Sequence, residues 1–173
     1  MIKTRIAFIL MLLSIATSVI AQERVKFLCK GAKPNPEHRY LNGTTTSGVV
    51  NLAPNTSSLY SGTIWEKVSV GGDVFIFRCL NNNNSNPKAK FFYLNGVTST
   101  GQVNLASDKD APNSGTHWKE VHLKDGTLAF QCLNSSLNPK GVFLNGNTAT
   151  GGVNLAGDNN EKNNSGTHWA IER

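Results

Sequence analysis

The chain lacks the residue patterns on which common catalytic chemistry depends. Its 173 residues contain no G-x-S-x-G, no H-E-x-x-H and no cysteine with a histidine at motif spacing. No carboxylate pair recurs along the chain, and no stretch after residue 21 is apolar enough to cross a membrane. We therefore expect neither an enzyme nor membrane insertion, and we expect no cofactor or bound metal.

The first 21 residues differ from the rest. Lys3 and Arg5 precede the apolar run IAFILMLLSIATSVIA, which has the length of a secretory signal and is shorter than the roughly 20 residues of a spanning helix. Val19 and Ala21 provide small residues for cleavage before Gln22. The sequence thus predicts a signal peptide at 1–21, a single domain at 22–173, and a secreted, periplasmic or extracellular location.

Acidic residues are fewer than basic ones. The chain has 17 Lys and Arg against 11 Asp and Glu, a net charge of +6, which falls when Lys3 and Arg5 are removed with the signal. The excess is spread over loops instead of forming a block, and it slightly favours an acidic surface or a glycan as partner. Export argues against nucleic acid.

Cysteine is scarce, at Cys29, Cys79 and Cys132. An odd number leaves at least one thiol unpaired, and a disulfide needs Cα atoms within about 7 Å. We expect buried free thiols that act as small apolar side chains. A three-thiolate metal site, a chance pairing and a redox role are the alternatives.

Self-similarity, in contrast, is abundant. Three stretches, at about 24–70, 71–123 and 124–173, share F-x-C, N-P, an aromatic residue before L-N-G, G-x-V-N-L-A and S-G-T-x-W. The hexamer NSGTHW stands at 113–118 and again at 164–169, with YSGTIW at 60–65. Apolar and polar residues alternate over short runs, which predicts four short strands per copy and no helix. The three Asn-Gly pairs are expected to form tight turns with positive φ after the second strands.

Twelve short strands expose edges that a closed barrel would remove. The recurrence of Y-L-N-G, G-x-V-N-L-A and G-T-x-W resembles the β-trefoil, and more loosely the ricin-B and fascin-like trefoil lectins, over residues 24–173. T-x-W stands here where ricin-type repeats have Q-x-W. The resemblance implies an all-β trefoil of three internal repeats of about 50 residues, with a six-stranded barrel and a cap.

The three tryptophans, Trp65, Trp118 and Trp169, are expected to fill the space between barrel and cap. Exposed rings that stack on sugars are the alternative.

Several recurring polar and aromatic positions are candidate sugar-binding residues, because amides can bond vicinal hydroxyls and aromatic rings can stack on a sugar. They are Asn51, Asn104, Asn154, Tyr40, Tyr93, Phe143, Asp108, Asp158, His117 and His168. As alternatives, the amides stabilise the backbone, the rings shield the barrel wall and the acids are solvated. Asp108 and Asp110 could bind Ca²⁺, and the histidines could form a pH switch, bind a metal or lie at the surface.

These features predict a secreted carbohydrate-binding protein with up to three equivalent weak sites, whose partners are glycans or glycoconjugates. The alternative is a trefoil protease inhibitor or protein-binding scaffold that acts through one loop. A third interpretation is a protein partner at the cell envelope.

Overall fold

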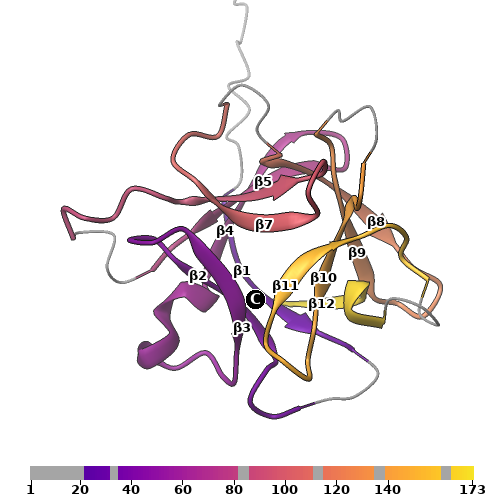
Figure 1. Ribbon diagram of the computed structural model, residues 1–173, viewed down its shortest axis with the longest axis horizontal. Coiled ribbons are helices and arrows are strands. Elements are labelled where there is room, and N and C mark those ends of the chain that lie inside the picture. The colour runs from indigo at the N-terminus through magenta and orange to yellow at the C-terminus, as the bar shows by residue number, and fades with distance from the viewer. Residues whose placement is uncertain (1–21, 32–34, 82–85, 111–114, 135–138, 161–164) are drawn as a thin grey trace, which may run out of the picture.

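A computed structural model describes residues 22–31, 35–81, 86–110, 115–134, 139–160 and 165–173 (Figure 1). The predicted signal peptide, residues 1–21, lies outside this part, so its prediction and that of export stay untested. In the described ranges there is no helix with the length and apolarity needed to span a membrane.

The described chain is built from short strands. They are β1 (Glu23–Cys29), β2 (Tyr40–Thr44), β3 (Val49–Ala53), β4 (Trp65–Gly71), β5 (Val74–Cys79), β6 (Tyr93–Val97), β7 (Gln102–Ala106), β8 (His117–His122), β9 (Leu128–Cys132), β10 (Phe143–Gly146), β11 (Val153–Ala156) and β12 (Trp169–Glu172). Short 3₁₀ segments, η1 (Ser58–Thr63) and η3 (Ser165–Thr167), precede β4 and β12.

All of these strands belong to one antiparallel sheet that closes on itself. The hairpins β2–β3, β6–β7 and β10–β11 are connected through β3–β7 and β7–β11. Strand β1 pairs with β2, β4 and β12, so the first and last strands lie side by side (Figure 1). Closure leaves few edges unpaired.

The expected β-trefoil is therefore wrong. The structure is a closed ten-strand antiparallel β-barrel with extra strands. The expectation was a six-stranded barrel with a cap, but the hairpins β2–β3, β6–β7 and β10–β11 are hydrogen-bonded to one another and to the other strands, in one 12-stranded sheet. This pairing satisfies backbone N–H and C=O groups that a separate cap would leave open. The all-β class is confirmed, whereas the resemblance to trefoil lectins has no support.

The barrel centre is aromatic. Phe27, Phe77 and Phe130 are fully buried, and their ring centroids lie 4.9, 5.0 and 5.4 Å apart in edge-to-face contacts. These are the phenylalanines of the three F-x-C motifs. Burial and edge-to-face contact of three rings at one point give the sheet its core.

The tryptophans are buried as expected. None of the three rings is exposed to solvent, so none can stack on a sugar at the surface. Each indole Nε1 donates to a carbonyl oxygen of an L-N-G leucine: Trp65 to Leu41, Trp118 to Leu94 and Trp169 to Leu144, at 3.0 to 3.1 Å. The ring thus joins two motifs far apart in sequence, and its polar N–H is satisfied inside the core.

The glycines of L-N-G do not form the predicted positive-φ turn. Gly43, Gly96 and Gly146 lie within strands, and the positive φ values fall later, at Gly48, Gly101 and Gly151. Gly96 is required for a different reason, because an added Cβ would lie 2.8 Å from the Cys132 sulfur and 3.1 Å from the Trp118 ring. The sequence shows that glycine is needed there, but the reason lies in tertiary packing.

The cysteines are free and buried, which confirms the expectation. Each thiol lies 3.4 to 3.7 Å from two glycine carbonyl oxygens, one from L-N-G and one from S-G-T. Burial raises the pKa of Cys29 and of Cys79 to about 11, and also raises the pKa of Cys132. Thiols held in this protonated form are poor nucleophiles and poor metal ligands.

Candidate functional site: an amide-lined cavity

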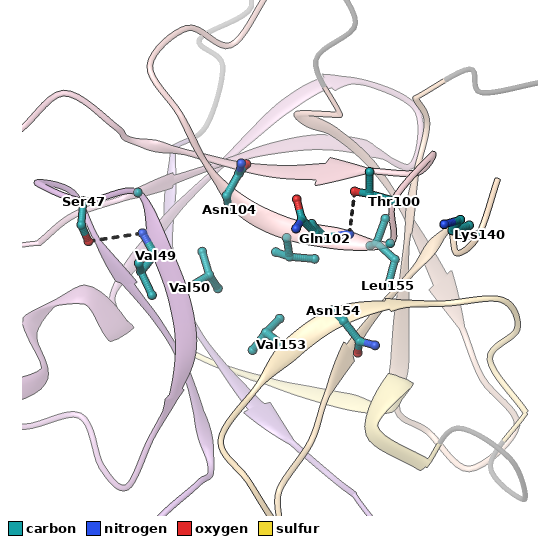
Figure 2. Close-up of a pocket in the computed structure, with 13 residues that line it drawn as sticks. Ser47, Val49, Val50, Thr100, Gln102, Asn104, Lys140, Val153, Asn154 and Leu155 are labelled. Atoms are coloured by element: carbon teal, nitrogen blue, oxygen red, sulfur yellow. Dashed lines mark hydrogen bonds between the residues drawn. The ribbon is translucent and has the colours of Figure 1, made fainter.

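The strands β3, β7 and β11 converge around a cavity of about 580 Å³ (Figure 2). Val50, Val103 and Val153, one from each strand, form its apolar floor. The polar side chains that line the cavity are those of Ser47, Thr100, Gln102, Asn104, Lys140 and Asn154. The sheet places them together because Val49 pairs with Asn104 and Gln102 pairs with Asn154 across neighbouring strands.

The amides of Asn104 and Asn154 are held in fixed orientations. Asn95 Nδ2 donates to Asn104 Oδ1 at 2.7 Å, and Asn145 Nδ2 donates to Asn154 Oδ1 at 2.6 Å. With its oxygen engaged, each amide keeps its NH₂ group as a donor, but Figure 2 shows both side chains at the rim, pointing away from Val50 and Val153 at the cavity centre. A ligand that reaches the rim of the cavity meets donors whose orientation is already set, which lowers the entropy cost of binding.

The repeated hexamer contributes to this orientation. Asn95 is largely buried, and its Oδ1 accepts a hydrogen bond of 2.6 Å from the backbone N–H of Gly115. A chain of bonds therefore runs from Gly115 through Asn95 to Asn104 at the cavity wall. The S-G-T segment thereby positions the cavity amide as well as packing the core.

The three predicted asparagines are not equivalent. Asn104 and Asn154 line the cavity, whereas Asn51 does not, although Asn42 Nδ2 donates to its Oδ1 at 2.8 Å in the same way. The local motif is therefore repeated three times, but the tertiary structure brings only two of its copies to this cavity.

The predicted aromatic platforms lie elsewhere. Tyr40, Tyr93 and Phe143 are half-buried, pair with Ala53, Ala106 and Ala156 of the neighbouring strands, and do not line the cavity. The Tyr40 hydroxyl donates to a Glu172 carboxylate oxygen at 3.4 Å. Their placement fits the alternative in which these rings cover the barrel wall.

The predicted loop acids stabilise their own turns. Asp108 Oδ1 accepts from the backbone N–H of Asp110 at 3.0 Å, and Asp158 Oδ1 accepts from that of Asn160 at 2.9 Å. Both aspartates are exposed, and neither lines the cavity. Within the described ranges, no group of three or more His, Cys, Asp or Glu side chains is placed to hold a metal ion.

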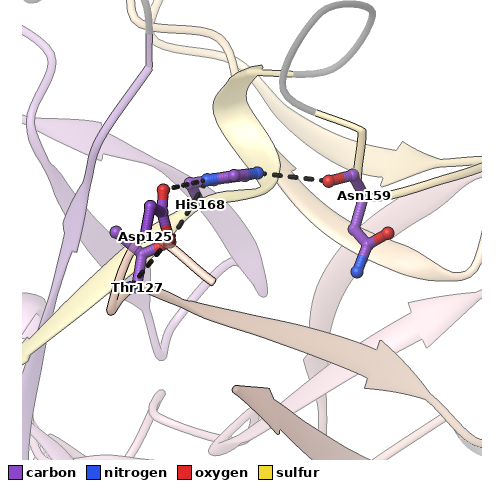
Figure 3. A network of polar contacts seen from close by, with 4 residues as sticks. All are labelled: Asp125, Thr127, Asn159 and His168. Carbon is purple, nitrogen blue, oxygen red and sulfur yellow. Dashed lines mark hydrogen bonds and ion pairs between the residues drawn. The ribbon is translucent and has the colours of Figure 1, made fainter. Parts of the chain in front are cut away.

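The two hexamer histidines have different environments. His168 is buried, and Figure 3 shows its ring between Asp125 and Asn159, with Nδ1 2.8 Å from Asp125 Oδ2 and Nε2 3.1 Å from Asn159 O. His117 is half-buried, and its Nδ1 lies 3.4 Å from Thr116 Oγ1. His168 thus joins the β8–β9 turn to the segment after β11, and neither histidine lines the cavity.

The stability that this network contributes depends on pH through Asp125. Hydrogen bonds from the Thr127 side chain and backbone, and then from His168, lower the pKa of Asp125 from 3.8 to about 2. A depressed pKa stabilises the folded state above pH 3.8, and this contribution is lost as the pH falls toward 2. We expect the urea midpoint, measured by tryptophan fluorescence, to fall more steeply between pH 4 and pH 2 in the native chain than in Asp125→Asn. Parallel slopes in the two proteins would contradict this assignment.

Sequence reasoning missed several cavity residues. Gln102 occupies the variable position of G-x-V-N-L-A, where the other copies have Val49 and Gly152, and Lys140 lies in a loop. A search for shared positions cannot find them, because the three copies differ at these sites. Only the pairing of β7 with β11 shows that they face one cavity. Comparison with protein-family models and with curated proteins finds no match for this chain.

Proposed function

We propose that the chain is a carbohydrate-binding protein whose main site is the amide-lined cavity. The observation that carries this proposal is a cavity with a valine floor and with the oriented amides of Asn104 and Asn154 at its rim. The volume of about 580 Å³ lies in the range of small-molecule sites, roughly 300–1,000 Å³. A monosaccharide unit has this combination of features, an apolar C–H face and a ring of hydroxyls.

The groups at the wall suit hydroxyl recognition. An amide NH₂ donates to a hydroxyl oxygen, and the side chains of Gln102 and Thr100 supply further donors and acceptors. Gln102 is exposed, so its amide is accessible to a ligand. The valine floor would contact the C–H face of the sugar and favour burial of that face. The cavity favours one site of this kind over the three equal sites expected from the repeats.

A glycan array probed with the full chain tests this proposal. We expect a saturable hit that a free monosaccharide competes. Asn104→Ala should then weaken binding about tenfold, or about 1.4 kcal/mol, in calorimetric titration. Asn51→Ala is the matched control, because it removes the same Asn–Asn bond outside the cavity and should leave the affinity unchanged.

The outcomes separate the candidate functions. Equal losses in both variants would indicate several equivalent sites instead of this cavity, and a blank array would contradict carbohydrate binding. The second candidate is a protein-binding scaffold or protease inhibitor that acts through one loop. It is favoured by Leu59 of η1, which is 87% exposed and would suit contact with a protein.

A further inference from the structure

One of three equivalent glycine corners, the one at Gly101 beside the cavity, lacks an aromatic ring. Gly48, Gly101 and Gly151 begin the G-x-V-N-L-A segments with φ of 77°, 79° and 77°. An ideal Cβ at Gly48 would lie 3.3 Å from the Phe91 ring, and one at Gly151 would lie 2.6 Å from the His38 ring. At Gly101 the nearest neighbours are Leu155 O at 3.7 Å and Lys140 Cβ at 4.0 Å.

The sequence explains this open corner. Gly141 precedes V-F-L-N-G in the third copy, at the place where the second copy has Phe91 before F-Y-L-N-G. Without a ring at that position, the space beside Gly101 is left to Lys140, whose backbone N–H donates to Thr98 O at 2.8 Å. Figure 2 shows Lys140 beside Thr100, at the edge of the cavity.

Lys140 brings an unbalanced positive charge to this corner. Its side chain is exposed, and no carboxylate occurs among the described residues that line the cavity. The ion pairs found in the described ranges do not include it. A ligand with a negative group at the Gly101 corner would therefore gain an attraction that a neutral ligand lacks.

We propose that the ligand of this cavity is an acidic sugar, one that carries a carboxylate or a sulfate ester. Its ring lies over the valines, while its anionic group occupies the corner between Gly101 and Lys140. This inference rests on the proposed carbohydrate-binding function. Because Lys140 is solvent-exposed, the preference over the neutral sugar is about three- to tenfold.

Calorimetric titration of the full chain with matched sugars at low salt tests the inference. The pairs are glucose with glucuronate, galactose with galacturonate, and N-acetylglucosamine with its 6-sulfate. We expect tighter binding of an acidic member and loss of that preference in Lys140→Gln. Lys90→Gln is the matched control, since the Lys90 backbone N–H donates to Thr45 O at 3.0 Å in the equivalent loop but Lys90 does not line the cavity.

The results distinguish failure of the inference from failure of the function. Equal binding of neutral and acidic sugars, or a preference that survives in Lys140→Gln, overturns the acidic-sugar inference and leaves carbohydrate binding in place. Inorganic sulfate that binds as tightly as the sulfated sugar overturns it too, because the site would then recognise an anion alone. If no member of any pair binds, both proposals fail.

Discussion

Gly115→Ala is expected to destabilise the protein by more than about 4 kcal/mol, a large share of the roughly 5–15 kcal/mol that stabilises a typical domain. A Cβ at this buried position would overlap the Gly96 carbonyl oxygen, a rigid backbone group, and would lie 2.7 Å from the Cys132 sulfur. The backbone would have to move, which would break the bonds from Gly115 N–H to Asn95 and from Gly96 N–H to Gly115 O.

Gly157→Ala is the control for this substitution. Gly157 is exposed, and a Cβ there would meet no atom within 4 Å. Urea unfolding followed by tryptophan fluorescence should show a large loss, or no folded protein, for Gly115→Ala and little change for Gly157→Ala. A folded Gly115→Ala variant with near-native stability would contradict the close approach of the two glycines.

His168→Ala is expected to cost about 2 kcal/mol, whereas His117→Ala should change stability by less than about 0.5 kcal/mol. Both histidines occupy the same place in the identical hexamer NSGTHW. Only His168 is buried with both ring nitrogens near acceptors, on Asp125 and on Asn159. Its loss removes two bonds that join separate turns and leaves a cavity where the ring was.

Urea unfolding of the two variants at pH 6 measures the difference. Asp125→Ala removes the other partner in this network, because it deletes the carboxylate but leaves the His168 ring in place. Equal losses of stability for His168→Ala and His117→Ala would contradict this assignment. The contribution of each histidine would then come from its place in the hexamer and not from the network in Figure 3.

The sequence predicted well wherever a residue's role follows from its own local pattern. Alternation of apolar and polar residues predicted short strands such as β5, and the odd number of cysteines predicted free thiols. Trp118 was correctly expected in the core. Each of these conclusions needs only strand periodicity and the general cost of exposing large apolar groups.

Predictions that needed contacts between distant segments were wrong or incomplete. Gly96 was expected to form a turn, but it lies in a strand, where glycine is needed because a Cβ would crowd the Cys132 sulfur and the Trp118 ring. The expected division into a six-stranded barrel and a cap is absent, because β3–β7 and β7–β11 pairing joins the hairpins into one closed sheet. Local propensity describes the conformation of a segment, but it does not identify the segment's partners.

The sequence by itself determined an all-β chain with three similar copies, their strands and their buried anchors, because these follow from periodicity and from the burial of apolar groups. Only the tertiary structure decided which strands pair, why two histidines in identical hexamers differ, and which polar groups share a cavity. Gln102 and Lys140 are unremarkable in the sequence, and they line one cavity because β7 pairs with β11 and no ring stands beside Gly101. The asymmetry on which the proposed function depends arises from positions where the copies differ.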